Sequence, residues 1–444
     1  MFGVRQGECL SPLLFSMFLN DIEDHFILHG YHGIDISFTK LFLLLYADDI
    51  VILADTAEEL QNGFDILYEY CKKWRLKVNT NKTKVIIFRK SGILPRNLNF
   101  HFDGNDIEIV KSFNYLGVVF TQGGSFKELQ STIAGQAQKA IFKLNSYLFK
   151  FANVSVKHRL DLFDKLILPI LNYSCEVWGF HTADCIERVH TLYCKKILNV
   201  KRTTQNDFVY GILGRKKLII NRYYRIVKYW LKLLCIENIK YTKIVYNLLL
   251  HDAEIYPNKK SWVTLLKSLL SELGFYEVWL AQNVGNTDIF LSVFKQRLND
   301  NFIQLWHTRI NESSRSIFYR EVVPNFCFQF YLNCVNVAKY RNSLSRFILS
   351  SHNLAVESGR WHKPRSIPFD DRKCNVCAVL EDEFHMLFEC VLYKDLRKKY
   401  IKRYFWNRPS MFKLQALFQS HNENILRNLG IFIHKAFELR KLRF

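Results

Sequence analysis

The sequence is short of residues that interrupt helices, with only 18 glycines and 8 prolines among 444 residues. This scarcity favours long helices and argues against a disordered chain or a small all-β module. No apolar run approaches the roughly 18 residues that a membrane span needs. The first residues, MFGVRQGECLSP, lack the apolar core of a secretory signal. We therefore expect an intracellular protein with no signal peptide and no transmembrane segment.

Acidic residues are the minority among the charged ones. The chain has 41 Asp or Glu against 62 Lys or Arg, which gives a net charge of +21. Such a surplus indicates a polyanionic partner, and nucleic acid is a commoner one than a membrane surface for a chain without a lipid-anchor motif. The 11 cysteines are expected to be mostly reduced, so a cysteine cluster is a candidate metal site before it is a disulfide.

The first 120 residues mix short β-prone runs with two helical segments. The stretch SPLLFSMFLNDIEDHF is predicted to be helical, with Ser11 as its N-cap and Pro12 at the first helical position. Thr56–Asn79 carries apolar residues at helical spacing. Two further runs are predicted to be strands, the second interrupted by a glycine: Thr83–Phe88 and Asn114–Phe120.

Beyond about residue 125 the pattern becomes helical, basic and rich in aromatic residues. The clearest helical segments are Phe126–Asn153, Val156–Tyr173, Asp184–Leu198 and Ile219–Leu234, and the same texture continues to about residue 345. A softer boundary, where Pro, Gly and Ser gather, lies at Ser350–Pro368. The last 54 residues carry 13 Lys or Arg and three acidic residues.

Two adjacent aspartates, Asp48 and Asp49, stand between two apolar runs in the stretch LFLLLYADDIVILAD. Burying unpaired carboxylates is very costly, and two neighbours also repel each other. The pair is therefore either exposed at an ordinary hairpin tip, because aspartate favours turns, or neutralised by cations. A two-residue tip prefers glycine, which is absent here, and this weakens the first interpretation.

The second interpretation fits phosphoryl transfer. In enzymes of that kind carboxylates hold two Mg²⁺ ions about 3.5–4 Å apart, and the ions stabilise the attacking and leaving oxygens. Upstream, the loop GVRQGECLSPLLF offers the amide of Gln6 and, at Gly7, a backbone that a base or phosphate can approach closely. An ordinary entry into a helix is the alternative for this loop. Downstream, Lys82 and Lys84 precede a strand and would face either a triphosphate or, as we expect for Lys84, solvent.

Four motifs, taken in their order along the chain, resemble the second half of a reverse transcriptase palm. They are RQGECLSPLLF, LYADDIVILAD, WRLKVNTNKTKVIIF and FNYLGVVF. The resemblance is to the polymerases of LINE-type, non-LTR retrotransposons, and among these to jockey-like elements. It implies an RNA-directed DNA polymerase that uses Mg²⁺, dNTP, an RNA template and a DNA primer or target, and a nuclear location. The segment Leu166–Phe180, which contains EVWGF, resembles the helical region after the palm in these elements. This segment and the cysteine spacing described below argue against a group II intron maturase or a telomerase relative.

The same resemblance implies roles for individual residues. Asp48 and Asp49 would hold Mg²⁺, and Lys82 would lie near the nucleotide phosphates and act as a general acid. Contacts to nucleotide and template fall on Gln6, Gly7, Ser11, Pro12 and Tyr46, and the primer grip falls on Tyr115, Leu116 and Gly117.

Such palms have a further metal-binding aspartate, on a strand before the Gln-Gly loop. The sequence starts at Met1, two residues before Gly3, so it contains neither that strand nor the fingers motifs. We therefore expect this chain alone to be an inactive polymerase fragment, because one carboxylate of the two-metal site is missing. The alternative is a non-catalytic nucleic-acid-binding remnant that keeps a zinc knuckle and basic helices.

One cysteine cluster has the spacing of a metal site, Cys374-x2-Cys377-x7-His385-x4-Cys390. Three thiolates and one imidazole are a complete tetrahedral zinc set, which makes a closed, structural site. A helical hairpin with incidental reduced thiols is the alternative. The cluster resembles the knuckle that follows the polymerase in LINE-type proteins and assists nucleic-acid binding there.

The neighbouring segment Leu392–Pro409 interleaves cations with aromatic residues. Cations neutralise phosphates and aromatic rings stack on bases, so the pattern suits single-stranded nucleic acid. A membrane-surface helix is the alternative, since basic amphipathic segments also bind anionic lipid. The aromatic residues are Tyr400, Tyr404, Phe405 and Trp406.

The predicted fold class is α+β: a partial reverse transcriptase palm with an antiparallel sheet and helices, then a mostly α-helical thumb and connector, then a small zinc-binding C-terminal domain. The predicted divisions are the C-terminal half of the palm (1–125), the helical thumb and connector (126–240), a helical linker domain (241–350) and the basic zinc-knuckle domain (351–444).

Overall fold

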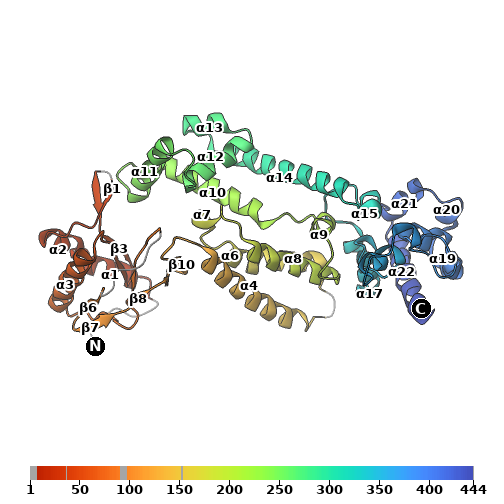
Figure 1. The fold of residues 1–444 in the computed structure, drawn as a ribbon, viewed down its shortest axis with the longest axis horizontal. Helices are drawn as coiled ribbons and strands as arrows, with labels where there is room; N and C mark the ends of the chain where they lie inside the picture. The colour runs from red at the N-terminus through yellow and green to blue at the C-terminus, as the bar shows by residue number, and fades with distance from the viewer. Residues whose placement is uncertain (1–7, 37, 91–97, 152–153, 444) are drawn as a thin grey trace. The chain divides into compact units, whose positions relative to one another are not determined.

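The computed structural model (Figure 1) describes residues 8–36, 38–90, 98–151 and 154–443. Its contacts divide the chain into two compact units, each made of two stretches. Unit 1 consists of Met1–Leu129 and Val227–Asn283, and unit 2 of Gln130–Ile226 and Val284–Phe444. All described strands lie in the first stretch of unit 1, and the other regular structure is helical. The predicted mixture of helices and small sheets is confirmed, whereas the four-part division stays a prediction.

Short strands pair two by two in the described part of unit 1. Four of these small sheets are antiparallel, and the pair β5 with β8 is parallel. The strands are β1 (Ile34–Ile36), β2 (Thr39–Leu41), β3 (Leu43–Tyr46), β4 (Asp49–Ile52), β5 (Val85–Ile86), β6 (Phe100–Phe102), β7 (Asn105–Ile107), β8 (Ile109–Val110), β9 (Ser112–Tyr115) and β10 (Val118–Thr121).

The predicted strand Asn114–Phe120, interrupted at Gly117, is a pair of strands joined as a hairpin in the structure. Strand β9 ends before Leu116 and Gly117, and β10 begins after them and pairs back antiparallel. Both turn residues have positive φ, +49° and +78°. A two-residue hairpin turn needs such angles, which glycine adopts without strain. The other predicted strand, Thr83–Phe88, is shortened to β5.

The first stretch of unit 1 also contains helices α1 (Ser11–Phe18), α2 (Ile22–Leu28) and α3 (Ala57–Trp74), and the second stretch contains α11 (Tyr241–Ile255), α12 (Trp262–Glu272) and α13 (Tyr276–Ala281). Two helices pass from one unit to the other along the chain: α4 (Lys127–Leu148) and α10 (Leu218–Cys235). None of the helices in the described ranges combines the length and the apolar character that crossing a bilayer requires.

Helix α1 differs from its prediction in how it begins. Leu10 is the N-cap and Ser11 is already the first helical residue, so the prediction of Ser11 as the N-cap is wrong. The reason is that Leu10 itself has near-helical backbone angles, which moves the start of the helix back by one residue. Pro12 lies in the first turn, where its missing N–H costs no hydrogen bond. The predicted segment also breaks into two helices, since α1 ends at Phe18 and α2 starts at Ile22.

Helix α3 forms within the predicted segment Thr56–Asn79 but ends at Trp74, and it organises the core of unit 1. The Thr56 side chain accepts a hydrogen bond from the Glu59 N–H at 3.1 Å and caps its N-terminus. On the buried face Phe64 meets Phe100 and Phe102 edge-on, with ring centroids 6.3 Å apart in both pairs. The helix therefore joins the small sheets to a shared apolar core.

The named elements of unit 2 are all helical in its described residues. Its further elements are α5 (Val156–Leu162), the π-turn η1 (Phe163–Ile167), α6 (Leu168–Leu171), α7 (Cys175–Trp178), α8 (Asp184–Leu198), α9 (Asn206–Leu213), α14 (Thr287–Glu312), α15 (Ile317–Val322), α16 (Tyr331–Cys334), α17 (Ala338–Ile348), α18 (Ala355–Ser358), η2 (Gly359–Trp361), η3 (Phe369–Asp371), η4 (His385–Glu389), η5 (Val391–Tyr393), α19 (Lys394–Tyr400), α20 (Arg403–Trp406), α21 (Met411–Phe418) and α22 (Glu423–Arg443).

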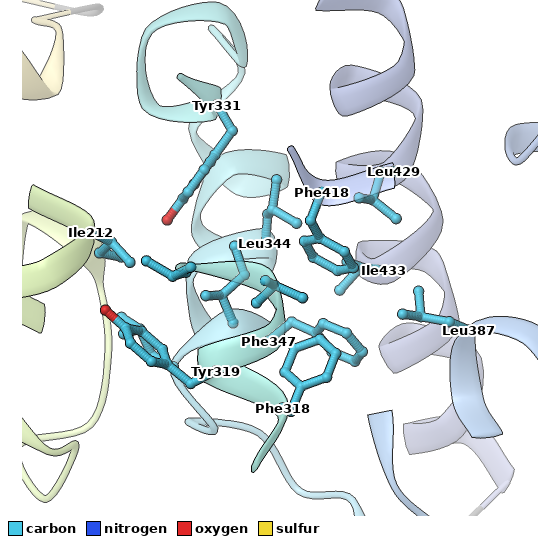
Figure 2. Close-up of a cluster of buried hydrophobic side chains, with 14 of the residues drawn as sticks. Ile212, Phe318, Tyr319, Tyr331, Leu344, Phe347, Leu387, Phe418, Leu429 and Ile433 are labelled. Atoms are coloured by element: carbon cyan, nitrogen blue, oxygen red, sulfur yellow. The ribbon is translucent and has the colours of Figure 1, made fainter. Parts of the chain in front are cut away.

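One large apolar core joins the C-terminal helices of unit 2. Figure 2 shows side chains from α9, α15, α17, α21 and α22 converging, with Phe347 between Phe318 and the residues of α22. Leu387 of η4 reaches the same core, and the neighbouring Cys374 and Cys390 belong to it as well. The cysteine-bearing segment and the helices that precede residue 350 therefore share one hydrophobic interior.

Candidate functional site

Strands β3 and β4 form an antiparallel hairpin, here called the acidic hairpin, that carries Asp48 and Asp49 at its apex. Tyr46 pairs with Asp49, so the turn itself consists of Ala47 and Asp48. Ala47 has a φ of +52°, which costs an L-residue about 1–2 kcal/mol. The glycine that such a turn prefers is replaced by a strained alanine, and the hairpin forms nevertheless.

The side chains at this apex are open to solvent. Asp48 and Asp49 are exposed, and Tyr46 is 62% exposed. No ion pair joins either carboxylate to a described lysine or arginine. The two adjacent aspartates therefore have no ion-pair partner in the part of the chain that the structure describes, and their oxygens can bind a hard cation.

The second hairpin, β9–β10, lies close enough to the acidic apex for the charge there to affect the pKa of Tyr115. Burial and the negative charge of Asp49 both raise the pKa of Tyr115 above its usual value, burial being the larger cause. The structure thus brings Tyr115 near Asp49, two residues that lie 66 positions apart in the sequence. Leu116 and Gly117, predicted with Tyr115 as the primer grip, are the exposed turn of this hairpin.

The other residues predicted to serve the polymerase site belong to neither hairpin. Gln6 and Gly7 lie outside the described residues. Ser11 is buried and Pro12 exposed in the first turn of α1. Lys82 is exposed in the turn before β5, where its backbone N–H donates to the Asn79 carbonyl, and no described ion pair joins it to the acidic apex.

The predicted zinc ligands converge in unit 2. The ligand atoms of Cys374, Cys377, His385 and Cys390 all lie within 4.8 Å of one another. The Cys390 sulfur is 3.9 Å from that of Cys374 and 3.8 Å from that of Cys377. We call these four residues the CCHC cluster.

The backbone around the first two cysteines is folded into a tight turn. The Cys374 N–H donates to the Val379 carbonyl at 2.7 Å, and the Ala378 N–H donates to the Cys374 carbonyl at 2.9 Å. An antiparallel bridge between Lys373 and Leu380 closes the turn. This turn places both thiols of the Cys-x2-Cys motif on one side.

His385 supplies the strongest indication that the cluster is built for an ion. Its ring is almost fully buried, and its Nε2 has no hydrogen-bond partner among the residues that the structure describes. Its Nδ1 faces the Glu389 carboxylate at 3.4 Å. A metal-binding histidine has this arrangement, with one nitrogen oriented by a carboxylate and the other directed at the ion. Burial, together with the neighbouring Cys374 and Cys377, raises the pKa of the Cys390 thiol to about 12, so a bound cation would stabilise its thiolate.

Two residues that support this cluster were not identified from the sequence. Glu389 is one helical turn after His385, and that spacing was a usable signal. Arg397 is buried and donates to the backbone oxygens of Met386, Leu387 and Cys390 at 3.3, 2.6 and 3.0 Å. In the sequence Arg397 looks like one more cation of a basic run, and nothing marks it as internal.

The basic and aromatic segment Leu392–Pro409 is only partly a surface feature. Tyr404 is 57% exposed, whereas Phe405 is 6% exposed and belongs to the core. Trp406 is half-buried and donates its indole N–H to the Ile401 carbonyl. The prediction that all four aromatic rings stack on bases is therefore wrong for Phe405, because the fold uses that ring for packing.

The family comparison matches residues 1–120 to the family described as reverse transcriptase (RNA-dependent DNA polymerase). That range contains both the acidic hairpin and the hairpin that carries Tyr115. The CCHC cluster lies far outside the matched range.

Curated proteins extend this similarity beyond residue 120. The chain is 26% identical over 196 residues to the probable RNA-directed DNA polymerase from transposon BS of Drosophila melanogaster, covering 43% of this chain and 21% of the relative. It is 22% identical over 204 residues to the RNA-directed DNA polymerase from mobile element jockey of Drosophila funebris, covering 45% and 22%. The chain thus spans about a fifth of the length of these two relatives. The Pol polyprotein from type-1 retrotransposable element R1 2 of Nasonia vitripennis is 22% identical over 303 residues, covering 62% and 66%.

Proposed function

Because residues 1–120 belong to the reverse transcriptase family and the chain is related to RNA-directed DNA polymerases of non-LTR retrotransposons, we propose that it forms part of such a polymerase. The observation that supports this most directly is the acidic hairpin, with two adjacent, exposed and unpaired carboxylates beside the hairpin of Tyr115. The substrates would be dNTP, an RNA template and a DNA primer or target. A nuclear location accompanies the proposal, because the target would be chromosomal DNA.

The oxygens of Asp48 and Asp49 would hold Mg²⁺, which is a hard cation that prefers carboxylate ligands. Mg²⁺ bound there would stabilise the charge that develops on the attacking and leaving oxygens. Tyr46 and Tyr115 flank the acidic apex and would limit how a nucleotide and a primer end approach it. Lys82 would contact the triphosphate and act as a general acid, and Gln6, Gly7, Ser11 and Pro12 would contact nucleotide and template.

The test is divalent-ion binding at the acidic hairpin, with Mn²⁺ as a paramagnetic probe in place of Mg²⁺. We expect the double variant D48N/D49N to lose the tightest Mn²⁺ site of the chain, measured by the electron paramagnetic resonance of free Mn²⁺. D55N is the matched control, because Asp55 is an exposed aspartate shortly after β4. Equal Mn²⁺ affinity in the wild type and in D48N/D49N would overturn the assignment. In any active polypeptide that contains these residues, D49N should abolish Mg²⁺-dependent primer extension and D55N should not.

The CCHC cluster would hold a structural zinc ion. Its donor set, its burial and the partnerless Nε2 of His385 fit Zn²⁺, which three thiolates and one imidazole surround completely. We expect one equivalent of zinc to disappear in C377S, measured by elemental analysis of the purified chain. C185S is the matched control, because Cys185 is a half-buried cysteine outside the cluster.

Nucleic acid would be the partner of the surface around the CCHC cluster, where exposed Lys402, Arg403 and Tyr404 follow one another. Binding without polymerisation is the alternative function, and the convergence of the CCHC cluster is the observation that favours it. Single-stranded RNA should compete with anionic liposomes for the chain and win, with an affinity that falls steeply as salt rises. Displacement of RNA by liposomes would support the membrane-surface interpretation instead.

A further inference from the structure

A second group of metal-binding side chains lies in unit 1, away from the acidic hairpin. It consists of His25 on α2, His29 at the end of α2 and Glu69 on α3, and we call it the histidine–glutamate cluster. One ligand atom from each residue lies within 4.8 Å of the other two. Positions four apart share one face of a helix, so α2 turns both imidazoles towards α3. We propose that these three residues bind a zinc-class divalent ion.

The hydrogen bonds of His29 leave one nitrogen for a cation. Its Nδ1 lies 2.8 Å from the His25 backbone oxygen, and because a carbonyl can only accept, Nδ1 carries the proton. In the neutral ring Nε2 then presents a lone pair. That lone pair faces the Glu69 carboxylate oxygen at 3.4 Å. Two acceptors facing each other repel, unless the ring takes a second proton or a cation lies between them.

The spacing of the two facing atoms favours a bridging cation. A charged N–H···O hydrogen bond is shorter, at about 2.7–2.9 Å. Two ligands that are each about 2.0–2.1 Å from a tetrahedral ion lie about 3.4 Å apart. The His29–Glu69 separation of 3.4 Å fits the second geometry.

His25 is the third ligand, and its environment supports a bound ion independently of the His29–Glu69 distance. Its Nε2 is buried and has no hydrogen-bond partner among the described groups. A buried, unsatisfied ring nitrogen is costly, and an ion within the cluster would satisfy it.

The donor set selects the class of ion. Two imidazoles and one carboxylate suit zinc and its neighbours in the first transition row, whereas Mg²⁺ prefers oxygen ligands throughout. Three protein ligands also leave one coordination position for water or another molecule, unlike the four ligands of the CCHC cluster. His29 and Glu69 are 40% and 63% exposed, so solvent reaches that position. A bound ion would tie the end of α2 to the last turns of α3.

The experiment compares zinc binding in the full chain and in H25Q/H29Q, after removal of metal by a chelator. We expect the wild type to bind one more zinc per chain, measured by titration against a chromophoric chelator and by elemental analysis. The difference isolates this cluster, because the CCHC cluster is intact in both proteins. H101Q is the matched control: His101 faces the Asp106 carboxylate at 2.7 Å in the same unit, without a second histidine. It should leave zinc binding unchanged.

Two further measurements guard against misfolding of the variant. E69Q keeps both imidazoles and should weaken zinc binding at least tenfold, since even losing a group that only orients a ligand costs about 10–100-fold. In the wild type, zinc should protect His29 from carbethoxylation and leave His101 reactive, as read by peptide mass spectrometry. Equal zinc stoichiometry in the wild type and in H25Q/H29Q, or His29 reactivity that zinc does not change, would overturn the proposal. Neither result bears on the acidic hairpin, which shares no residue with this cluster.

Discussion

Ala47 occupies the point at which the acidic hairpin reverses, with a φ of +52° that side-chain-bearing residues rarely adopt. The apolar strands on either side hold it there, because Leu43, Ile50 and Ile52 pack against the core of unit 1. The strain therefore lies directly beside the two aspartates. Backbone strain of this size is stable only where the surrounding structure compensates for it.

Replacing Ala47 with glycine should relieve this strain. We expect A47G to stabilise the acidic hairpin by up to about 1 kcal/mol, because glycine adopts positive φ without a Cβ clash. Slower hydrogen exchange of the β3 and β4 amides would measure the effect. A57G is the control, since Ala57 is the first residue of α3, and there glycine should speed exchange instead. Unchanged or faster exchange in A47G would show that the turn is not strained.

Arg397 is a second single residue whose contribution to the stability of unit 2 can be predicted from its contacts. Its guanidinium satisfies three backbone oxygens around η4 and Cys390. We expect R397M to lower the free energy of unfolding of unit 2 by about 3 kcal/mol, because each buried carbonyl left without a donor costs about 1–3 kcal/mol. Urea unfolding followed by tryptophan fluorescence measures this change. R403M, which removes an exposed arginine of the same segment, should change it by less than about 0.5 kcal/mol.

At the scale of elements, helix α8 buries a histidine that makes unit 2 sensitive to acid. His190 is fully buried between Phe163 and Tyr210, and Arg215 donates to its Nε2 at 3.4 Å. Burial, and after it the charge of Arg215, holds the pKa of His190 well below its usual value. The folded state therefore keeps the ring neutral where the unfolded state has begun to protonate it.

The pH dependence follows from this difference. Below about pH 6.5 the unfolded chain binds a proton at this position that the folded chain does not, so stability falls as pH falls, by at most about 1.4 kcal/mol per pH unit. We expect the stability difference between the wild type and H190Q to shrink from pH 7 to pH 5, as measured by urea midpoints. H158Q, which changes an exposed histidine of α5, should show no such trend. A difference that stays constant with pH would contradict the assignment.

Elements whose signals are local could be predicted from the sequence. The spacing of Phe64, Leu67 and Cys71 predicts α3, and the adjacent aspartates predict a carboxylate pair on a hairpin. The spacing of the CCHC cluster predicts that its four side chains meet, and they do.

The features that could not be predicted from the sequence depend on packing between segments that are far apart in the chain. From the sequence Gly117 is expected to interrupt a strand, and the structure adds that Leu116 joins it in the turn between the paired strands β9 and β10. Phe405 is expected on a nucleic-acid surface, yet it packs in the core of unit 2. Arg397 and the contact between α2 and α3 depend on segments that only the fold brings together, and no local pattern predicts them.

At the scale of the whole molecule, the CCHC cluster is continuous with the interior of unit 2 rather than set apart from it. Cys374, Leu387 and Cys390 lie in the same core as Phe347 of α17 (Figure 2). Loss of the proposed zinc should therefore destabilise helices well beyond the four ligands.

We expect C377S to raise the hydrogen-exchange rates of α17 and α22 together with those of η4, because one packed core connects them. Amides of α12, which lies in unit 1, serve as the internal reference and should exchange as in the wild type. Mass spectrometry of peptic fragments measures both. Faster exchange confined to residues 374–390 would instead indicate a cluster that folds independently.

The order of segments in the two units has a consequence for biosynthesis. Unit 1 needs Val227–Asn283, and the ribosome produces this stretch only after the whole of 130–226. The latter belongs to unit 2, which itself waits for residues from Val284 onwards. The contacts of unit 1 are therefore complete only once residues up to Asn283 have emerged, after the whole first stretch of unit 2.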